Sequence, residues 1–216
     1  KSLAINLANN KNYISCLGKS KINYKNIKSL KCNFKNLIDI KKKLSKLINT
    51  RKLDYIFLNA GILGEINHIE KIQSLKVIEI LKINVLANKE ILDFIIQKKI
   101  KTKLIIAISS GAAIAPKVGW YLYCSSKSAF KFLIESYALE NKEIKFINVS
   151  PGLIKTKMQS KICKINEKKI PSVKKFKILN KTNRVPSPDE VSRNILANIG
   201  NFIKKRSGSF IDIRKK

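Results

Sequence analysis

The stretch Leu104-Ile105-Ile106-Ala107-Ile108-Ser109-Ser110-Gly111 decides the fold class of this chain. Its five apolar residues are typical of a strand that is buried on both faces of a sheet, and a small polar turn follows directly. The arrangement occurs twice more, because Tyr55–Leu58 precedes Asn59-Ala60-Gly61 and Phe146–Val149 precedes Ser150-Pro151-Gly152. Three such turns predict a single cleft at the carboxyl ends of parallel strands.

Segments with helical spacing alternate with these strands along the whole chain. We expect helices over Ser2–Asn9, Asn36–Ile48, 70–82, 84–98 and Cys124–Glu140, and further short strands over Tyr13–Leu17, Ser29–Cys32 and Phe210–Ile213. A last helix should begin at the capping box of Ser187 and Glu190 and end at Gly200. The alternation predicts an α/β fold, a doubly wound parallel sheet with helices on both faces, built as one domain over 1–216.

Composition excludes several classes of function. The chain has 216 residues, 24.5 kDa, 44% apolar residues and a formal net charge of +31, so it is not a disordered basic tail. Only five of its 45 basic residues are Arg, and the Lys residues are spread evenly, so we interpret the charge as a coding bias rather than specific nucleic-acid binding. No apolar run approaches the ~20 residues of a membrane span, and no signal peptide opens the chain. We therefore expect a cytoplasmic protein without a membrane partner.

Metal and disulfide chemistry find little support in the sequence. The four Cys residues form no CxxC pair, which predicts reduced thiols. His68 has no Cys or His neighbour, so it is interpreted as a loop residue and no metal site is predicted.

Tyr123 and Lys127 are the residues that point to a reaction. They are four apart near the start of a helix, so both side chains project from one face. Tyr24 and Lys28 have the same spacing, but the residue thirteen before Tyr24 lies in a polar turn. The residue thirteen before Tyr123 is Ser110, at the end of a buried strand.

Taken in order, these elements resemble the short-chain dehydrogenase/reductase family, with a Rossmann-type sheet and a nicotinamide cofactor. The resemblance implies that Tyr123 donates a proton to a carbonyl oxygen, which Ser110 binds as charge develops. Lys127 would lower the pKa of the Tyr123 phenol and hold the nicotinamide ribose. Asn84 would hold a water molecule in a proton relay to Lys127. A ketone reduction also needs a hydride, which no side chain can supply.

The same resemblance implies a cofactor site along the strand ends. Its residues would be Lys19, Ser20, Asn33, Asn59, Ala60, Gly61, Tyr123, Lys127, Pro151, Gly152, Ile154 and Thr156. No acidic residue follows the strand Tyr13–Leu17, and Lys19 and Ser20 could hold a 2′-phosphate, so NADP(H) is favoured over NAD(H). Asn33 stands where the family often has an Asp.

Each residue also has an ordinary structural interpretation. Asn84 could cap or kink the helix 84–98, Ser110 could be a turn residue, and Thr156 could cap a short helix. The turn 59–61 could be an ordinary connection from a strand to a helix. The functional interpretation is favoured by the order and spacing of five elements together. They are the turn 59–61, Asn84, Ser110, the pair Tyr123 and Lys127, and the segment Pro151–Thr156.

One part of the family pattern is absent from this sequence. There is no glycine-rich turn of the Gly-x-x-x-Gly-x-Gly type, and no strand precedes it. We therefore expect a gap between strands and a weakened phosphate site in this chain. We also expect the natural protein to be longer than 24.5 kDa at its N-terminus.

Substrate choice is predicted to depend on residues 157–186, a polar, irregular segment that would form a substrate flap. Its apolar residues suit a bulky, uncharged carbonyl compound; they are Met158, Ile162, Ile165, Ile170 and Val173. The stretch Gly119–Lys127 and the final Gly208–Asp212 are most similar to the sepiapterin-reductase and benzil-reductase branch, which implies reduction of a ketone or diketone. The family also implies a homodimer or homotetramer.

Three other functions remain open at this point. A 3-oxoacyl carrier-protein reductase would suit a basic surface, because its carrier is acidic. A degenerate, cofactor-free scaffold would not bind NADPH, and a nucleic-acid binder would show strongly salt-dependent binding.

Overall fold

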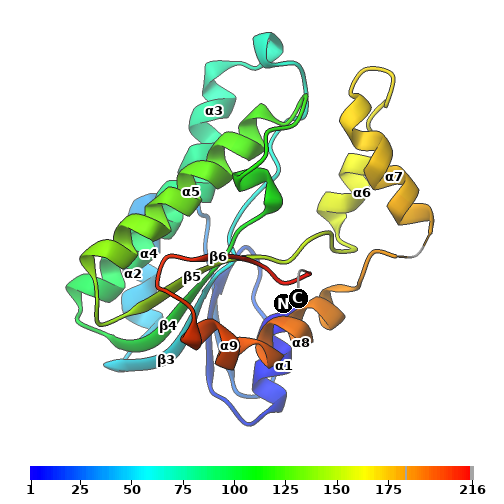
Figure 1. Ribbon diagram of the computed structural model, residues 1–216. Coiled ribbons are helices and arrows are strands. Elements are labelled where there is room, and N and C mark those ends of the chain that lie inside the picture. The colour runs from blue at the N-terminus through cyan, green and yellow to red at the C-terminus, as the bar shows by residue number, and fades with distance from the viewer. Residues whose placement is uncertain (183, 215–216) are drawn as a thin grey trace.

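Parallel strands form the centre of the protein, and they are divided between two sheets (Figure 1). The computed structural model describes residues 1–182 and 184–214. One sheet has the order β3 (Lys52–Leu58), β4 (Lys101–Ile108), β5 (Lys145–Ser150) and β6 (Phe210–Asp212). The other consists of β1 (Ile14–Gly18) and β2 (Ile27–Lys31). Every strand pair is parallel, which confirms the predicted sheet.

The division falls between β2 and β3 in the sequence, as the absent strand predicted. Neither β1 nor β2 pairs with β3 in the described part of the chain. β3 is therefore an edge strand, and its residues Tyr55, Ile56 and Phe57 are half-buried rather than fully buried as predicted. In contrast, Leu104–Ala107 of β4 are fully buried between β3 and β5.

Helices cover both faces of the four-stranded sheet, which confirms the doubly wound arrangement (Figure 1). Ile105 and Ala107 of β4 pack against α4 (Ala87–Gln97) and α5 (Tyr121–Glu140). The alternate residues Leu104 and Ile106 face the other way, because successive side chains of a strand point to opposite faces. They pack with residues of α8 (Pro188–Ala197), α9 (Ile199–Lys204) and α1 (Ser2–Asn9).

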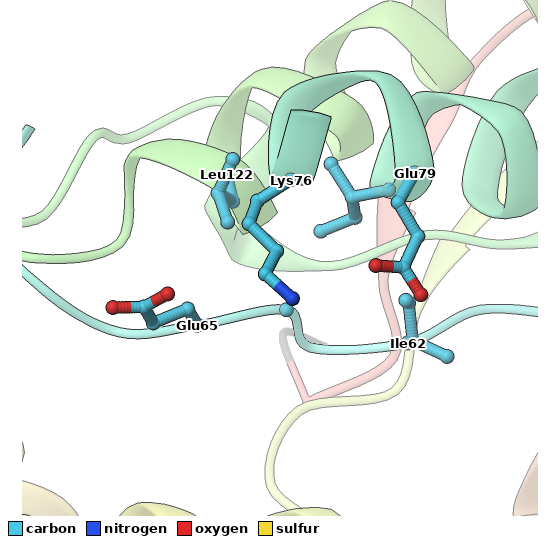
Figure 2. A pocket seen from close by; sticks show the side chains of 7 residues that line it. Ile62, Glu65, Lys76, Glu79 and Leu122 are labelled. Carbon is cyan, nitrogen blue, oxygen red and sulfur yellow. The ribbon is translucent and has the colours of Figure 1, made fainter. Parts of the chain in front are cut away.

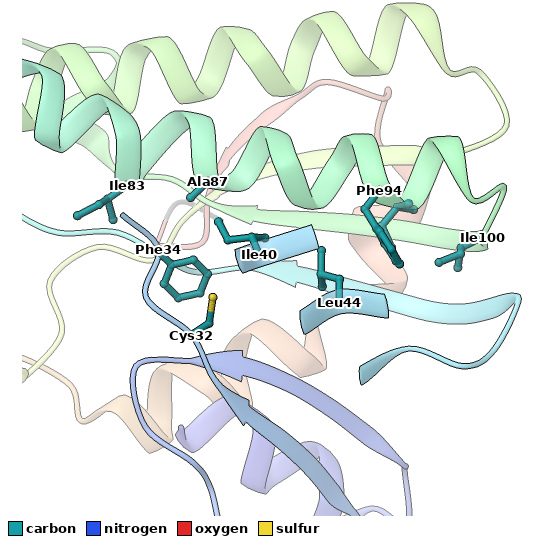
Figure 3. Packing of buried hydrophobic residues seen from close by; sticks show 9 residues of the cluster. Cys32, Phe34, Ile40, Leu44, Ile83, Ala87, Phe94 and Ile100 are labelled. Carbon is teal, nitrogen blue, oxygen red and sulfur yellow. The ribbon is translucent and has the colours of Figure 1, made fainter. Parts of the chain in front are cut away.

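A separate apolar cluster joins the end of β2 to this core (Figure 3). Cys32 and Phe34 follow β2 and lie against Ile40 and Leu44 of α2 (Leu37–Leu47). The same cluster continues into α4 and the residues that flank it, through Ile83, Ala87, Phe94, Ile95 and Ile100. The α2 helix begins where the Asn36 side chain accepts a hydrogen bond from the Asp39 amide at 3.2 Å. The small sheet is thus held to the large one by side chains and not by strand pairing.

The two helices predicted over 70–82 and 84–98 form one continuous rod. It consists of α3 (Ser74–Leu81), a π-helical turn over Lys82–Leu86, and α4. Such turns insert an extra residue into a helix and are frequent at functional sites. This turn holds Asn84.

Two predictions about local structure are wrong. The segment 157–186 is not irregular, because it contains α6 (Lys157–Cys163) and α7 (Lys174–Lys181). Gly200 does not end the helix that starts at the Ser187 capping box; α8 ends at Ala197 and Gly200 lies inside α9. The capping box itself is confirmed, with the Glu190 side chain 2.7 Å from the Ser187 amide.

Candidate functional site

The three polar turns lie at the carboxyl ends of adjacent parallel strands, where the sequence placed them. Asn59–Gly61 follows β3, Ser109–Gly111 follows β4 and Pro151–Gly152 follows β5. α5 lies beside the short helix that continues from the middle turn, since the Ser128 hydroxyl donates to the Ala113 carbonyl at 2.9 Å. Residues far apart in the sequence therefore meet at one edge of the sheet.

Tyr123 and Ser110 are brought together at this edge. The Ser110 side chain lies close enough to the Tyr123 phenol to affect its ionisation, and the Ser110 hydroxyl accepts from the Ala112 amide at 3.2 Å. Burial raises the pKa of the Tyr123 phenol, and Ser110 works in the opposite direction. Lys127 was predicted to lower the pKa of the Tyr123 phenol, but it does not contribute to the shift of this pKa. In this structure burial determines the direction of the shift.

Lys127 is a buried cation one helical turn beyond Tyr123. Its side chain is 6% exposed, and its Nζ donates to the Ile108 carbonyl oxygen at 2.8 Å. Burial lowers the pKa of its ammonium from 10.5 to about 8. The Phe130 ring centroid lies 5.3 Å from Nζ and adds a cation–π contact. An ammonium has three donors, so two remain for other acceptors.

Asn84 lies at the centre of a buried hydrogen-bond network. Its Oδ1 accepts from the Ile62 amide at 2.7 Å, and its Nδ2 donates to the Ile62 carbonyl at 2.9 Å. The same Nδ2 donates to the Ser126 hydroxyl at 2.9 Å. Asn84 thereby joins the π-helical turn to the loop after β3 and to α5. It occupies a distorted turn, as its ordinary interpretation suggested, but it also contacts the helix that carries Tyr123 and Lys127.

Gly61 leaves space beside these two residues. A Cβ at this position would stand 3.4 Å from Asn84 Oδ1 and 3.7 Å from Lys127 Nζ. A side chain would therefore cover the ammonium. The open cradle and the two spare donors of Lys127 fit the ribose of a nicotinamide cofactor. Of the residues predicted for the site, Gly61, Asn84 and Lys127 meet there.

The turn after β5 has a conformation that glycine favours. Gly152 has φ +77°, and an added Cβ would lie 2.5 Å from Arg214 Cδ. Asp212 holds Arg214 there, accepting from its Nε at 2.8 Å. Thr156 caps α6 by accepting from the Gln159 amide at 3.3 Å, so its ordinary interpretation is correct in this structure.

The remaining predicted cofactor residues differ in setting. Pro151 is buried, Ile154 packs against the sheet, Ala60 is half-buried and Asn59 is exposed. Lys19 and Ser20 follow β1, and Asn33 follows β2. All three residues are exposed.

Two lysines that sequence reasoning missed, Lys35 and Lys76, lie near Glu79 of α3 together with the predicted Lys19. Lys35 Nζ lies 2.5 Å from Glu79 Oε1. This bond, with Lys76 and Lys19 nearby, lowers the pKa of the Glu79 carboxyl. Figure 2 shows Lys76 between Glu65 and Glu79 at a surface pocket. Lys19, Lys35 and Lys76 come from three separate segments, so no local pattern in the sequence indicates the group.

The segment predicted to be a substrate flap packs over the N-terminal end of α5. Trp120 is 3% exposed and stacks on Phe176 of α7, with ring centroids 4.9 Å apart. The Trp120 and Tyr123 rings also form an edge-to-face pair, with their centroids 6.2 Å apart. The apolar flap residues named from the sequence join this cluster: Met158, Ile162, Ile165, Ile170 and Val173. The flap therefore places an apolar surface beside the phenol.

Two kinds of feature are absent from the described residues. The described residues contain no cluster of three or more His, Cys, Asp or Glu side chains that could hold a metal ion. Within residues 1–182 and 184–214, no helix is both long and apolar enough to cross a bilayer.

Comparison with known proteins agrees with this geometry. The family model of the short chain dehydrogenases matches residues 3–167. A benzil reductase ((S)-benzoin forming) of Bacillus subtilis is 32% identical over 99 residues, which are 44% of this chain and 41% of that protein. An uncharacterized oxidoreductase of Schizosaccharomyces pombe is 29% identical over 165 residues, 74% of this chain and 67% of the other. A sepiapterin reductase of Rattus norvegicus is 36% identical over 58 residues, 27% of this chain and 22% of that protein.

Solved structures show the same fold. A short chain dehydrogenase/reductase from Saccharomyces cerevisiae superposes with a TM-score of 0.82 at 18% identity, covering 92% of this chain and 84% of the other. The NADP-bound structure of ElxO gives a TM-score of 0.68 at 23% identity, covering 88% and 77%. The match to the Bacillus subtilis relative spans less than half of that protein's length.

Proposed function

The chain belongs to the short-chain dehydrogenase family, and from this premise we propose that the protein is an NADP(H)-dependent oxidoreductase that reduces the carbonyl of a ketone or diketone. The observation that carries the proposal is the pairing of Tyr123 with Ser110, one helical turn from the buried ammonium of Lys127. These residues supply a proton donor, a hydrogen-bond donor and a cation at one edge of the sheet.

Each side chain has a defined task in this reaction. When bound, the nicotinamide cofactor supplies the hydride that no side chain can supply. Tyr123 donates its phenolic proton to the carbonyl oxygen, and Ser110 donates a hydrogen bond to the same oxygen as its charge develops. Lys127 holds the ribose through its spare donors. Burial favours the neutral phenol before the reaction, so Tyr123 is kept in its proton-donating form.

The preference for NADP(H) is supported by the lysines around Glu79. A 2′-phosphate carries about two negative charges near neutral pH and binds lysine ammonium groups. Lys19 and Lys35 follow the two strands of the small sheet, and both face Glu79. No acidic side chain follows β1 that would select the free 2′-hydroxyl of NAD. The fold neighbour ElxO also holds NADP.

The substrate class is supported by the apolar flap and by the relatives. Trp120, Phe176 and the buried flap residues give the phenol an apolar, aromatic neighbourhood. Such surroundings fit an uncharged, bulky carbonyl compound. The relatives include a benzil reductase and a sepiapterin reductase. We propose a diketone or aryl ketone as the substrate.

The test is NADPH oxidation by the full-length protein, followed with benzil and a panel of simpler ketones. Tyr123→Phe should lower kcat at least about 100-fold, because it removes the proton donor and leaves the ring in place. Tyr121→Phe is the matched control, since Tyr121 lies on the same helix and is half-buried. Lys35→Gln should raise the KM for NADPH and leave the KM for NADH unchanged.

The outcomes separate the alternatives. No NADPH binding and no turnover would support the cofactor-free scaffold and overturn the proposal. Turnover that Tyr123→Phe leaves unchanged would exclude Tyr123 as the proton donor. Equal use of NADH and NADPH would overturn the cofactor preference alone.

A further inference from the structure

The side-chain amide and the backbone carbonyl of Asn84 are each bonded by a side chain outside the proposed catalytic set. Ser126 binds its side-chain amide, and Asn88 binds its backbone carbonyl. Ser126 and Asn88 are fully buried, so neither bond is exchanged for one to bulk water. Buried bonds of this kind fix geometry, because a group that loses its partner is left unsatisfied.

Ser126 connects the network to the helix that carries Tyr123 and Lys127. Its hydroxyl accepts from Asn84 Nδ2 at 2.9 Å and donates to the Tyr123 carbonyl at 3.0 Å. It directly precedes Lys127 in the sequence. This hydroxyl therefore links the α5 turn that bears both reactive side chains to the π-helical turn.

Asn88 connects the same π-helical turn to the loop after β3. Its Nδ2 donates to the Asn84 carbonyl at 2.9 Å and to the Ala60 carbonyl at 3.3 Å. Both partners are acceptors, so the amide nitrogen must face them. Its Oδ1 is buried and has no hydrogen-bond partner among the described residues. A side chain selected only for packing would be apolar here, because a buried acceptor without a partner is unfavourable.

We propose that Ser126 and Asn88 are positioning residues, which fix Asn84 and, through it, the distance between the 59–61 turn and Lys127. The proposal rests on the reductase function above. The mechanism requires Lys127 to sit beside Gly61, where a Cβ would be 3.7 Å from its Nζ. Without the two bonds, α5 and the loop after β3 can separate, and water can reach the ammonium. This separation would also remove the fit of the ribose to Lys127.

The variants are Ser126→Ala and Asn88→Ala, each with a matched control. Ser125→Ala removes the neighbouring hydroxyl, which bonds only to carbonyls of its own helix, at Tyr121 and Leu122. Asn148→Ala removes another fully buried amide with an unpartnered Oδ1, whose Nδ2 bonds only the Lys131 carbonyl. Ser126→Thr retains a hydroxyl and should therefore not show the changes in the pKa of Lys127 and in kcat that are expected for Ser126→Ala. Asn88→Ser serves if the alanine variant does not fold.

The first measurement needs no cofactor. Competitive trace acetylation, read by peptide mass spectrometry, gives the ionisation of each lysine separately. In Ser126→Ala and Asn88→Ala, the pKa of Lys127 should rise from about 8 by about one unit or more, because water relieves its burial. Both control variants should leave the pKa of Lys127 unchanged.

The second measurement is steady-state kinetics with NADPH and a ketone. Ser126→Ala and Asn88→Ala should lower kcat about 10- to 100-fold with little change in the KM of the ketone, as misplacement of a catalytic group does. If the pKa of Lys127 moves equally in test and control variants, or does not move, the positioning role is wrong. If the pKa moves only in the test variants and the wild type reduces no ketone, positioning stands and the proposed function fails. If the wild type is active and the test variants match it, the proposed function stands and the inference fails.

Discussion

The Lys127 ammonium donates to the backbone carbonyl oxygen of Ile108 at 2.8 Å, from the first turns of α5 to the last residue of β4. No carboxylate contributes to the ionisation of Lys127, and burial alone lowers the pKa of its ammonium to about 8. The carbonyl orients the cation but does not neutralise it. A buried charge of this kind reduces the free energy of unfolding and is typical of functional sites.

Lys127→Met should therefore change how stability depends on pH. The wild-type protein is destabilised while the buried lysine is charged, fully so below pH 8, and this loss disappears as pH rises to 10.5, the ordinary pKa of Lys. The free energy of unfolding of the wild type should rise relative to Lys127→Met by about 3 kcal/mol across that window. Urea unfolding of both proteins at several pH values measures it. A difference that stays constant from pH 7 to 11 would contradict the prediction.

Gly152→Ala should destabilise the turn after β5. The residue has φ +77°, and its Cβ would lie 2.5 Å from Arg214 Cδ. We expect the free energy of unfolding to fall by about 1–3 kcal/mol. Adding Arg214→Ala to Gly152→Ala should restore only the part of the free energy of unfolding that is lost through the collision with Arg214, because the backbone strain remains. Gly111→Ala is the control, since no atom lies within 4 Å of its added Cβ; an equal loss there would refute the explanation.

Ser172→Ala should loosen the flap. Trp120 Nε1 donates to the Ser172 hydroxyl at 2.9 Å, and this hydroxyl donates to the Val118 carbonyl at 2.8 Å. Its loss leaves the indole N–H without that partner, which is unfavourable by about 1–3 kcal/mol. Trypsin should then cleave between α6 and α7 faster than in the wild type. Ser160→Ala, an exposed residue of α6, should leave the cleavage rate unchanged.

Ser187→Ala should destabilise α8 and the contact of this helix with α1. The Ser187 hydroxyl accepts from the Glu190 amide at 3.2 Å, and loss of such a cap lowers the free energy of unfolding by about 1 kcal/mol. α8 also holds α1, through Asp189 and the Asn6 amide at 2.9 Å. Chemical denaturation measures the loss. Ser136→Ala, whose hydroxyl bonds only its own helix, should have a smaller effect.

The strands and the reactive pair could be predicted because their signals are local. Five apolar residues followed by Ser109-Ser110-Gly111 specify a buried strand and its end. Four residues of helix place Tyr123 and Lys127 on one face without reference to the rest of the chain. The Ser187 capping box is equally local, since both of its bonds lie within four residues.

Gly200 and the flap show where local signals fail. A glycine is an ordinary sign of a helix end, but Gly200 is tolerated inside α9, where no atom lies within 4 Å of an added Cβ. The flap forms helices because its apolar residues pack against Trp120 and Tyr123. Neither outcome follows from the residues nearest in sequence.

The sequence by itself determined the parallel sheet, the polar turns at its strand ends and the spacing of Tyr123 and Lys127, because short-range periodicity and turn chemistry encode these features. Only the tertiary structure decided that Ser126 meets Asn84 across 42 residues, that Lys35 meets Glu79, and that burial rather than Lys127 sets the direction of the Tyr123 pKa shift. Packing brings these groups together from separate elements, and desolvation depends on everything that surrounds a side chain.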